Sequence, residues 1–411
     1  MNYKEKDAIN ILGVNISTLK KKEILEKIEE FFYDGRQRQI VTPNPEFLLE
    51  ARKDEEFFYI LNSADLAVPD GIGLKFAAWL MGKNLFRTAG ADLVKDILEI
   101  ARKENKKVAI LNWDKGLSGA DDIKKAISKN YSSLKFIVDN ISREGINSVE
   151  TLRLKVGASL QEFNPDILFC ALGAPWQEKL IFHNLKKWTS VKIAMGVGGS
   201  FDYLTGKAAR APLIMRLLGL EWLWRLIRQP KRWKRIYNAV IVFLWVFLKW
   251  RFILPHFYRP SIVCMLYKKE NNQYKILLVQ RSDQKNHWQL PQGGTDGENL
   301  ARAGEREIKE EAGTDKFKTV ACYKNLYKYK FAERLGKYNL TVKNIVSHKG
   351  QKQGLCIAEF SGDDHDIKIN FWDHKGWKWV DAENLIKEVH PVRQEAAKMF
   401  LEKFKEVTKN S

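Results

Sequence analysis

Residues 167–179 read Ile167-Leu-Phe-Cys-Ala-Leu-Gly-Ala-Pro-Trp-Gln-Glu-Lys179, and they set the architecture of the first half of the chain. The stretch opens with an uninterrupted apolar run that ends at Gly173, which is typical of a short strand buried on both faces. The loop after it carries Pro175 and polar side chains. An apolar strand followed at once by a polar loop is the unit from which parallel α/β sheets are built.

The same unit recurs along the first 200 residues. Strands are predicted at 8–14, 39–41, 107–112, 134–138 and 192–198, with helical patterns between them, clearest at 20–33 and 93–105. Strands that alternate with helices predict a Rossmann-like α/β domain whose mostly parallel sheet is covered on both faces. Such sheets bind ligands at the carboxyl ends of their strands, so the informative residues are expected just after the apolar runs.

Five polar or glycine-rich blocks lie at those positions: 41–44, 64–73, 87–93, 172–179 and 196–202. Asp70 sits in the second block, inside Pro-Asp-Gly. On the dipeptide alone an Asp-Gly turn is more often structural than catalytic, because Asp bonds its own backbone and Gly accepts a positive φ. By themselves, the glycines between Gly196 and Gly199 are only weak evidence for a phosphate-binding loop.

Taken together and in order, these blocks resemble the TagA/WecG/CpsF family of bacterial glycosyltransferases. The matching pieces are TPN, ADLxVPDGIG, RxxGxDL, LGxPxQE, GVGGxFDxLxGKxxRAP and GLEWLxRLxxxPxRxxR, between residues 8 and 236. The resemblance implies transfer of an N-acetylmannosamine-type sugar from a UDP donor to polyprenyl-diphosphate-linked N-acetylglucosamine. It also implies inversion at the anomeric carbon, in the service of cell-envelope polysaccharide synthesis.

The resemblance also implies roles for individual residues. Asp70 matches the family's proposed base, which inverting displacement needs for the acceptor hydroxyl proton. Thr42 and Asn44 match positions near the donor sugar, and Arg87 and Gln177 fall in two further motifs as substrate-binding residues. The family's C-terminal arginines, which fold over the active site, match Arg225, Arg232 and Arg235.

Arginine can replace a metal at the departing diphosphate, because guanidinium forms bidentate bonds with phosphate oxygens. No Asp-x-Asp pair follows a strand in this half, so no cofactor is expected for the transferase domain. The spacing i, i+7, i+10 of the three arginines puts them on one face if the helix is continuous, although Pro230 argues against continuity.

Residues 207–257 differ in composition from the rest. Between residues 203 and 259 there are 12 basic residues and one acid, Glu221, out of a net charge of +19 for the whole chain. A solvated basic face and a nucleic-acid patch are the alternatives, but a basic, Trp-rich amphipathic segment is typical of a membrane surface. The apolar run 238–254 would form a helix roughly 26 Å long, and Lys249 and Arg251 interrupt its far end. We expect it to dock on the cytoplasmic face of the membrane without crossing it.

The last part of the chain carries a carboxylate cluster. Glu307, Glu310 and Glu311 share one face of a helix predicted over 300–312, and paired strands are predicted at 261–267 and 274–280. Three like charges on one face are costly unless a cation binds there, and carboxylate oxygens suit Mg²⁺ or Mn²⁺. A solvated acidic face is the alternative.

This cluster resembles the Nudix box, G-x5-E-x7-R-E-U-x-E-E-x-G-U. The helical core matches in full, whereas Gly293 and Glu298 enclose four residues instead of five, and Thr314 replaces the final apolar residue. Flanking motifs, among them Trp288–Gly294 and Lys349–Gln353, look like RNA pyrophosphohydrolases and dinucleoside polyphosphate hydrolases. The resemblance implies an α+β Nudix domain that hydrolyses a nucleoside polyphosphate or 5′-triphosphorylated RNA, with Glu310 as a catalytic residue.

The sequence thus predicts three parts: a transferase core at 1–206, a membrane-docking appendage at 207–257 and a Nudix domain at 258–411. Two alternatives remain open, a Nudix domain that only binds nucleotides and regulates, and an RNA-processing protein with a vestigial transferase. The oligomeric state is open too, a homo-oligomer included. The four cysteines show no paired spacing, so neither a zinc site nor a disulfide framework is expected, which suits a reducing cytoplasm. Cys170 and Cys264 lie in apolar runs and are expected to be buried thiols.

Overall fold

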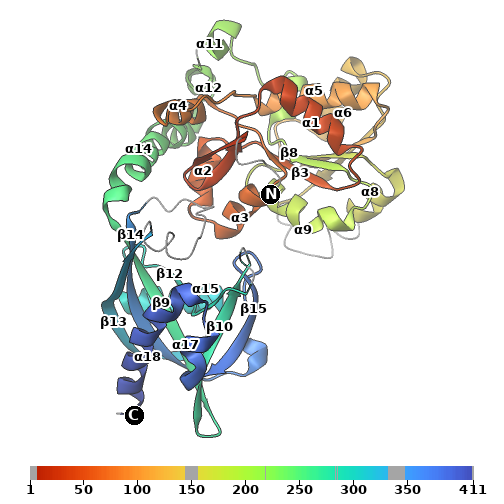
Figure 1. Cartoon of the computed structure of the whole chain (residues 1–411). Helices are drawn as coiled ribbons and strands as arrows, with labels where there is room; N and C mark the ends of the chain where they lie inside the picture. Colours follow the sequence, from red (N-terminus) through yellow and green to blue (C-terminus); the bar gives the residue numbers. More distant parts are fainter. Residues whose placement is uncertain are drawn as a thin grey trace. The chain divides into compact units, whose positions relative to one another are not determined.

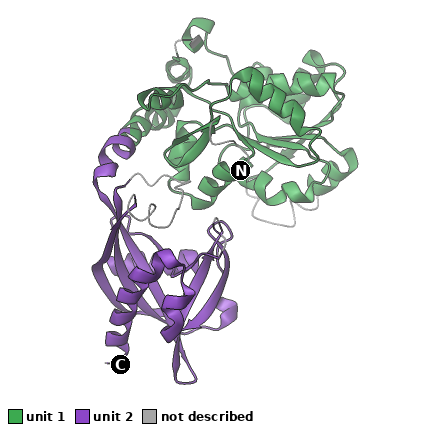
Figure 2. Cartoon of the chain, viewed as in Figure 1, with its two compact units in different colours: residues 1–247 green, residues 248–411 purple. Residues whose placement is uncertain are grey.

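A computed structural model describes residues 7–143, 156–217, 219–282, 284, 286–331 and 348–409. The chain divides into two compact units, residues 1–247 and 248–411 (Figure 2). The boundary between them falls inside the segment expected to be a separate appendage. The predicted division into three parts therefore stays a prediction.

The core of unit 1 is a six-stranded sheet in the order β4-β3-β8-β7-β5-β6, and every neighbouring pair is parallel (Figure 1). This confirms the predicted α/β class. The strands are β3 Arg38–Val41, β4 Leu66–Ala67, β5 Val108–Trp113, β6 Phe136–Ile141, β7 Ile167–Ala171 and β8 Ile193–Gly196. The helices between and after them are α1 Lys21–Phe31, α2 Pro45–Ala51, α3 Glu55–Ser63, α4 Ile72–Leu80, α5 Gly90–Lys103, α6 Ala120–Asn130, α8 Gly157–Phe163, α9 Trp176–Asn184 and α10 Ser200–Leu204.

Both faces of this sheet are buried. Phe169 faces a core built with α1, α5 and α6, whereas its neighbours Leu168 and Cys170 face a second core built with α8 and α9. Side chains alternate between the faces of a strand, so a strand covered on both sides must be apolar throughout. That is the physical origin of the uninterrupted run at 167–172.

The prediction of a single strand at 8–14 is wrong. Residues 8–14 do not form one strand but enter an antiparallel hairpin of β1 (Ala8–Ile11) and β2 (Val14–Ser17). The chain turns at Leu12 and Gly13, whose φ angles are +53° and +89°. Apolar residues continue through the turn, so composition alone did not mark it. The strand expected at 134–138 is shifted as well and runs from Phe136 to Ile141.

The basic segment is a series of short helices followed by a long one. They are α11 Leu213–Leu217, α12 Glu221–Arg228, a 3₁₀ turn Pro230–Arg232 and α13 Trp233–Tyr237, and helical turns then continue through α14 Phe243–Leu248 to His256. The continuous helix considered for the three arginines is therefore wrong. The chain leaves helical geometry at Gln229, with φ −138° and ψ 67°, because the following Pro230 disfavours a helical residue before it.

One helix in the described residues, Pro230–His256, is long and apolar enough to cross a membrane by length and composition alone. Only 17% of its most apolar stretch is buried. Phe243 and Phe247 are among its buried side chains, and Phe243 packs against Gly73 of α4. Within unit 1, the part of the helix around Phe243 therefore lies against α4.

Unit 2 is a mixed sheet between helices, as an α+β domain predicts. Its strand order is β11-β10-β9-β14-β13, with β12 beside β9 and β15 beside β10. The strands are β9 Tyr258–Glu270, β10 Gln273–Arg281, β11 Trp288–Gln289, β12 Gln292–Gly294, β13 Phe317–Lys330, β14 Gly350–Phe360 and β15 His374–Asp381. Two separate cores pack helix α15 (Leu300–Glu311) and helix α18 (Gln394–Lys409) onto this sheet. The predicted hairpin is confirmed, and it turns at Asn271 and Asn272, both with positive φ.

The expectation that the cysteines form no disulfide is wrong for one pair, which lies in unit 2. Cys322 and Cys356 face each other across β13 and β14, with Cα atoms 4.2 Å apart, and form a disulfide. The two cysteines are 34 residues apart, so no local sequence pattern marks them as a pair, and only the strand register brings them together. Cys170 and Cys264 are free and buried, as expected.

Candidate active sites

A cavity of about 900 Å³ lies in unit 1 at the carboxyl ends of the parallel strands. Every predicted transferase residue lines it: Thr42, Asn44, Asp70, Arg87, Gln177, Arg225, Arg232 and Arg235. These residues span almost 200 positions of sequence. The parallel sheet brings the first five together because each follows a strand or lies in a loop beside one, and the basic segment supplies the arginines.

Asp70 sits where the chain leaves β4 and enters α4. Its Oδ2 accepts a hydrogen bond from the Gly90 N–H at 3.1 Å, and the Arg87 Nε lies 3.8 Å from its Oδ1. Burial raises the pKa of the Asp70 carboxyl, although Arg87, the Gly90 N–H and Arg225 act in the opposite direction. A carboxylate with a raised pKa is a stronger proton acceptor, as general-base catalysis needs.

Thr42 and Asn44 lie on the loop between β3 and α2. A Cβ at Gly90 would lie 3.4 Å from the Asp70 Oδ2 and 3.6 Å from the Thr42 Oγ1, so Thr42 and Asp70 border one small space beside Gly90. The Asn44 Oδ1 caps α2 by accepting from the Phe47 N–H at 3.0 Å. Asn44 is thus the N-cap of α2. The contact between Asn44 and the donor sugar stays a prediction.

Arg87 is held by a second acid. Its guanidinium forms an ion pair with Glu221, the single acid of the basic segment, in addition to its approach to Asp70. Glu221 begins α12, so this pair ties that helix to the loop before α5. The sequence marked Glu221 only as an exception in composition, and its role depends on a contact between residues 134 positions apart.

Gln177 joins two loops. Its Oε1 accepts from the N–H groups of Gly173 and Gly198, both at 2.9 Å, and its Nε2 donates to the buried Glu178 Oε1 at 2.6 Å. Burial raises the pKa of Glu178 to about 7. The geometry makes Gln177 a positioning residue for the loops after β7 and β8. Its predicted contact with substrate stays untested.

Three arginines reach the cavity from different short helices. Arg225 lies on α12, Arg232 ends the 3₁₀ turn and Arg235 lies on α13. Arg235 pairs with Glu46 at 2.6 Å, whereas Arg225 and Arg232 form no ion pair with any acid in the described ranges. Burial together with Arg235 and Arg225 lowers the pKa of Arg232, as expected where like charges converge. Such a cluster favours an anion with several oxygens.

Arg143 is a cavity residue that the sequence analysis missed. Its guanidinium lies 3.6 Å from the centre of the Trp113 ring, and its Nε donates to the Leu172 carbonyl at 2.7 Å. Burial and the nearby Arg235 lower its pKa. It follows β6 and so obeys the rule that site residues follow strands, but it matches none of the quoted motifs. It adds a further cation to the cavity wall.

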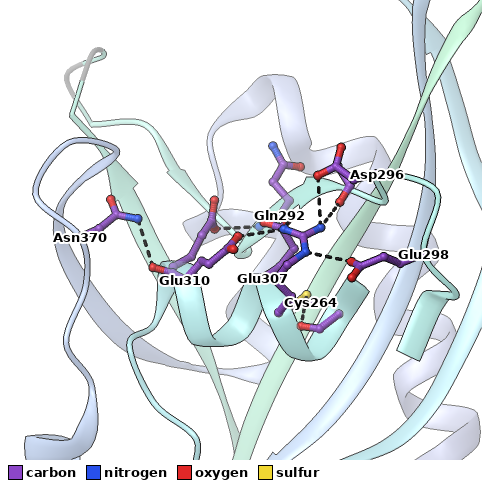
Figure 3. Close-up of polar contacts among 11 residues, drawn as sticks. Cys264, Gln292, Asp296, Glu298, Glu307, Glu310 and Asn370 are labelled. Carbon is purple, nitrogen blue, oxygen red and sulfur yellow. Dashed lines mark hydrogen bonds and ion pairs between the residues drawn. The ribbon is translucent and has the colours of Figure 1, made fainter. Parts of the chain in front are cut away.

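The carboxylate helix of unit 2 is α15, and Figure 3 shows its polar contacts. One nitrogen of Arg306, Nη1, donates to both the Glu307 Oε1 and the Glu310 Oε2, each at 2.8 Å. The same guanidinium also bonds Glu298 at 2.9 Å and the Gly294 carbonyl at 2.7 Å. Burial alone would lower the pKa of Arg306, but the surrounding carboxylates hold it well above its usual range. Arg306 therefore orients two of the glutamates on this helix.

Glu311 bonds the backbone at the start of β12. Its Oε2 accepts from the Gln292 N–H at 2.8 Å, and the His374 Nε2 lies 3.8 Å away. No group of three or more His, Cys, Asp or Glu in the described part of the chain is arranged as a metal site. The donor types nevertheless fit a hard divalent cation, since two carboxylates already converge on one cationic nitrogen. The metal set Glu307, Glu310 and Glu311 stays a prediction.

Gly293 is required by this arrangement. A Cβ on Gly293 would lie 1.9 Å from the Glu307 Oε2, far inside van der Waals contact. We expect Gly293→Ala to displace the Glu307 carboxylate and lower nucleotide hydrolysis by at least about tenfold, because a shift on the order of 1 Å is costly at a catalytic site. Gly297→Ala serves as a control, since a Cβ there would meet nothing within 4 Å, although its φ of +84° introduces some strain. Equal losses of hydrolysis in both variants would contradict the expectation.

Comparisons with known proteins match each half of the chain to a different family. Residues 9–256 match the glycosyl transferase WecG/TagA/CpsF family, and residues 257–402 match the NUDIX domain. An N-acetylglucosaminyldiphosphoundecaprenol N-acetyl-beta-D-mannosaminyltransferase of Bacillus subtilis is 36% identical over 214 residues, covering 52% of this chain and 80% of that protein. An RNA pyrophosphohydrolase of Wolbachia pipientis is 36% identical over 158 residues, covering 38% of this chain and 93% of that protein. A solved Ap4A hydrolase of C. elegans covers 34% of this chain and 94% of its own, at 22% identity and a TM-score of 0.27.

The two family models and the two relatives with similar sequences confirm the two resemblances drawn from the motifs and the enzyme classes that go with them, glycosyltransferase and Nudix pyrophosphohydrolase. The first family model alone spans more than half of the chain. The chain belongs to the glycosyl transferase WecG/TagA/CpsF family, and it carries a NUDIX domain C-terminal to the transferase domain.

Proposed function

We propose that unit 1 transfers an N-acetylmannosamine-type sugar from a UDP donor to a polyprenyl-diphosphate-linked N-acetylglucosamine, with inversion. The observation that carries the proposal is that Asp70 and the three arginines of the basic segment line the same cavity. The names of the relatives support the choice of sugar and acceptor. No cofactor is proposed for this reaction.

The proposed chemistry is a single displacement. The acceptor hydroxyl oxygen bonds to the anomeric carbon of the donor sugar, its proton passes to the Asp70 carboxylate, and the bond from that carbon to the UDP phosphate oxygen breaks. The raised pKa of Asp70 favours taking up this proton. Arg225, Arg232 and Arg235 stabilise the negative charge that develops on the departing diphosphate. Arg143, which lines the same cavity, adds positive charge near Arg235.

A transfer assay tests this function. The full-length chain is incubated with UDP-N-acetylmannosamine and a lipid-diphosphate-linked N-acetylglucosamine, and products are separated by chromatography. Release of UDP together with a disaccharide lipid of inverted anomeric configuration is expected. Hydrolysis of the donor without transfer would contradict the assignment.

For unit 2 we propose Mg²⁺- or Mn²⁺-dependent hydrolysis of a nucleoside polyphosphate or 5′-triphosphorylated RNA. Glu307, Glu310 and Glu311 would hold the cation, which when bound activates water and clamps phosphate oxygens. Arg306 keeps Glu307 and Glu310 turned toward a common point. The chain would then be a bifunctional enzyme of cell-envelope polysaccharide synthesis.

A second candidate function for unit 2 is regulatory nucleotide binding. Two observations favour it: the loop from Gly293 to Glu298 is one residue shorter than the Nudix pattern, and Arg306 already bonds two of the three glutamates. Screening the full-length chain against UDP-sugars, dinucleoside polyphosphates and triphosphorylated RNA separates the two. Binding without hydrolysis of any of them would select the regulatory role.

We further propose that the basic segment docks on the cytoplasmic face of the membrane without crossing it, since both sites use cytosolic nucleotides. Exposed apolar side chains lie on it, among them Ile214, Ile227, Trp233, Tyr237, Ile241 and Trp245. Lys249 and Arg251 make insertion of the long helix unfavourable.

Binding to vesicles that contain anionic lipid should therefore weaken steeply with added salt, since each basic residue near the surface contributes about 1 kcal/mol. Sedimentation with phosphatidylglycerol vesicles at increasing NaCl measures this effect, and vesicles of neutral lipid are the control. Protease protection of residues 258–411 in inside-out vesicles, with residues 1–206 accessible, would show instead that the chain crosses the membrane.

A further inference from the structure

A second cavity, of about 360 Å³, adjoins the proposed transferase site within unit 1. Its walls come from α4 and from the helix that runs through α14. The apolar lining comprises Ile72, Phe76, Ala77, Trp222, Ile236, Ala239, Val240, Phe243, Leu244 and Phe247. We call this space the apolar groove.

The apolar groove is continuous with the catalytic cavity. Asn44, Glu46, Asp70, Arg87, Glu221, Arg225, Arg232 and Arg235 line both spaces. One end of the groove therefore presents four guanidinium groups and three carboxylates, and the remainder presents hydrocarbon. A ligand that fits both ends has an anionic head and an apolar chain.

Close packing builds the groove walls. A Cβ at Gly73 would lie 3.4 Å from the Phe243 ring, and a Cβ at Gly219 would lie 2.6 Å from the Ile72 side chain. Phe243 and Phe247 are fully buried and stack with ring centres 6.3 Å apart. Both phenylalanines are thus packed into unit 1.

The groove also reaches exposed apolar surface. Phe76, which lines it, is 43% exposed, and its ring centre lies 5.7 Å from that of Trp79, which is 65% exposed. Exposed aromatic side chains of this kind are typical of surfaces that meet lipid. A chain held in the groove can therefore continue toward a membrane.

We propose that the apolar groove holds the first isoprene units of the acceptor's polyprenyl chain, while its diphosphate lies where the groove opens into the catalytic cavity, next to the arginines that face the donor diphosphate. This inference rests on the proposed transferase function and adds a binding site for the lipid part of the acceptor. It places the acceptor sugar next to Asp70 by holding both the diphosphate and the start of the chain. Recognition then depends on an apolar chain attached to the diphosphate.

Binding of farnesyl diphosphate to the full-length chain in EDTA tests the groove without requiring transfer. We expect it to bind more tightly than inorganic diphosphate, by about tenfold or more, since the groove removes several methylene groups from water. Ala239→Phe fills the groove, and Val240→Asn makes its wall polar without adding much volume. Both variants should reduce the affinity for farnesyl diphosphate to that for diphosphate and leave the affinity for diphosphate unchanged.

Ile241→Phe is the matched control, because Ile241 lies on the same helix, is 51% exposed and lines neither cavity. It should bind both ligands as the wild type does. Equal affinity of the wild type for the two ligands would overturn the proposal, and so would equal losses for both ligands in the groove variants. Concentration-dependent dimerisation that Ala239→Phe abolishes, without isoprenoid binding, would assign the groove to a second copy of the chain.

Transfer assays separate this inference from the function on which it rests. Acceptors with a long polyprenyl chain and with a short alkyl chain are compared, and Ala239→Phe should raise KM only for the former. If the wild type uses both acceptors equally and the variant changes neither KM, the groove proposal fails and the transferase function stands. If farnesyl diphosphate binds in the groove but no sugar is transferred, the proposed function fails and the lipid site stands.

Discussion

Asp70→Asn is expected to lower sugar transfer by roughly 100-fold or more, the scale of a lost general base. Asparagine keeps the size of the side chain and can still accept from the Gly90 N–H through its oxygen, so the loop should keep its shape. Binding of UDP should stay nearly unchanged, because the proposed diphosphate contacts come from arginines. Initial rates of transfer and calorimetric titration with UDP measure the two effects.

Asp121→Asn is the control for this variant, because the Asp121 side chain is 90% exposed on α6. It should transfer sugar at the wild-type rate. A rate near wild type for Asp70→Asn would remove Asp70 from the base role and leave it as a residue of the Pro-Asp-Gly turn.

The pH profile gives a second readout of the same residue. Burial raises the pKa of Asp70, and the base must be ionised to accept a proton. Transfer by the wild type should therefore fall as the pH drops through this raised pKa, at a higher pH than for an ordinary aspartate. The residual transfer activity of Asp70→Asn should not show this decrease at acidic pH.

Glu310→Gln is expected to abolish nucleotide hydrolysis and to leave sugar transfer intact. The substitution removes one of the carboxylates proposed to hold the cation and weakens the contact with the Arg306 Nη1. Removing one ligand of a catalytic metal costs both affinity and orientation. Both reactions are measured in the full-length chain, with and without EDTA, and transfer should resist EDTA because its proposed chemistry uses arginines.

Glu305→Gln is a suitable control on the same helix, since Glu305 approaches the Thr319 hydroxyl at 3.3 Å and lies outside the proposed cation set. It should hydrolyse nucleotides as the wild type does. Loss of transfer together with hydrolysis in a folded Glu310→Gln variant would show that the two activities are coupled. Absence of hydrolysis in the wild type would favour the regulatory role for unit 2.

Much of the candidate site could be predicted because its signals are local. Strands β5, β7 and β8 are buried almost throughout, so apolar runs such as 107–112 and 167–173 locate strands and therefore the loops at their carboxyl ends. Glu307, Glu310 and Glu311 share a helix face by spacing alone. For the same reason Arg306 meets Glu310, because residues four positions apart on a helix face are neighbours whatever the rest of the fold does.

By itself, then, the sequence determined the α/β and α+β classes, the residues that follow the strands and the acidic face of α15, because each depends on residues within a few positions of one another. Only the tertiary structure decided the ion pair of Arg87 with Glu221, the place of Arg143 against Trp113 and the disulfide of Cys322 with Cys356. It also decided that the arginines of the basic segment meet in one cavity although their helix breaks at Gln229. These features join segments far apart in the chain, and their geometry follows from sheet order and packing, which no local pattern records.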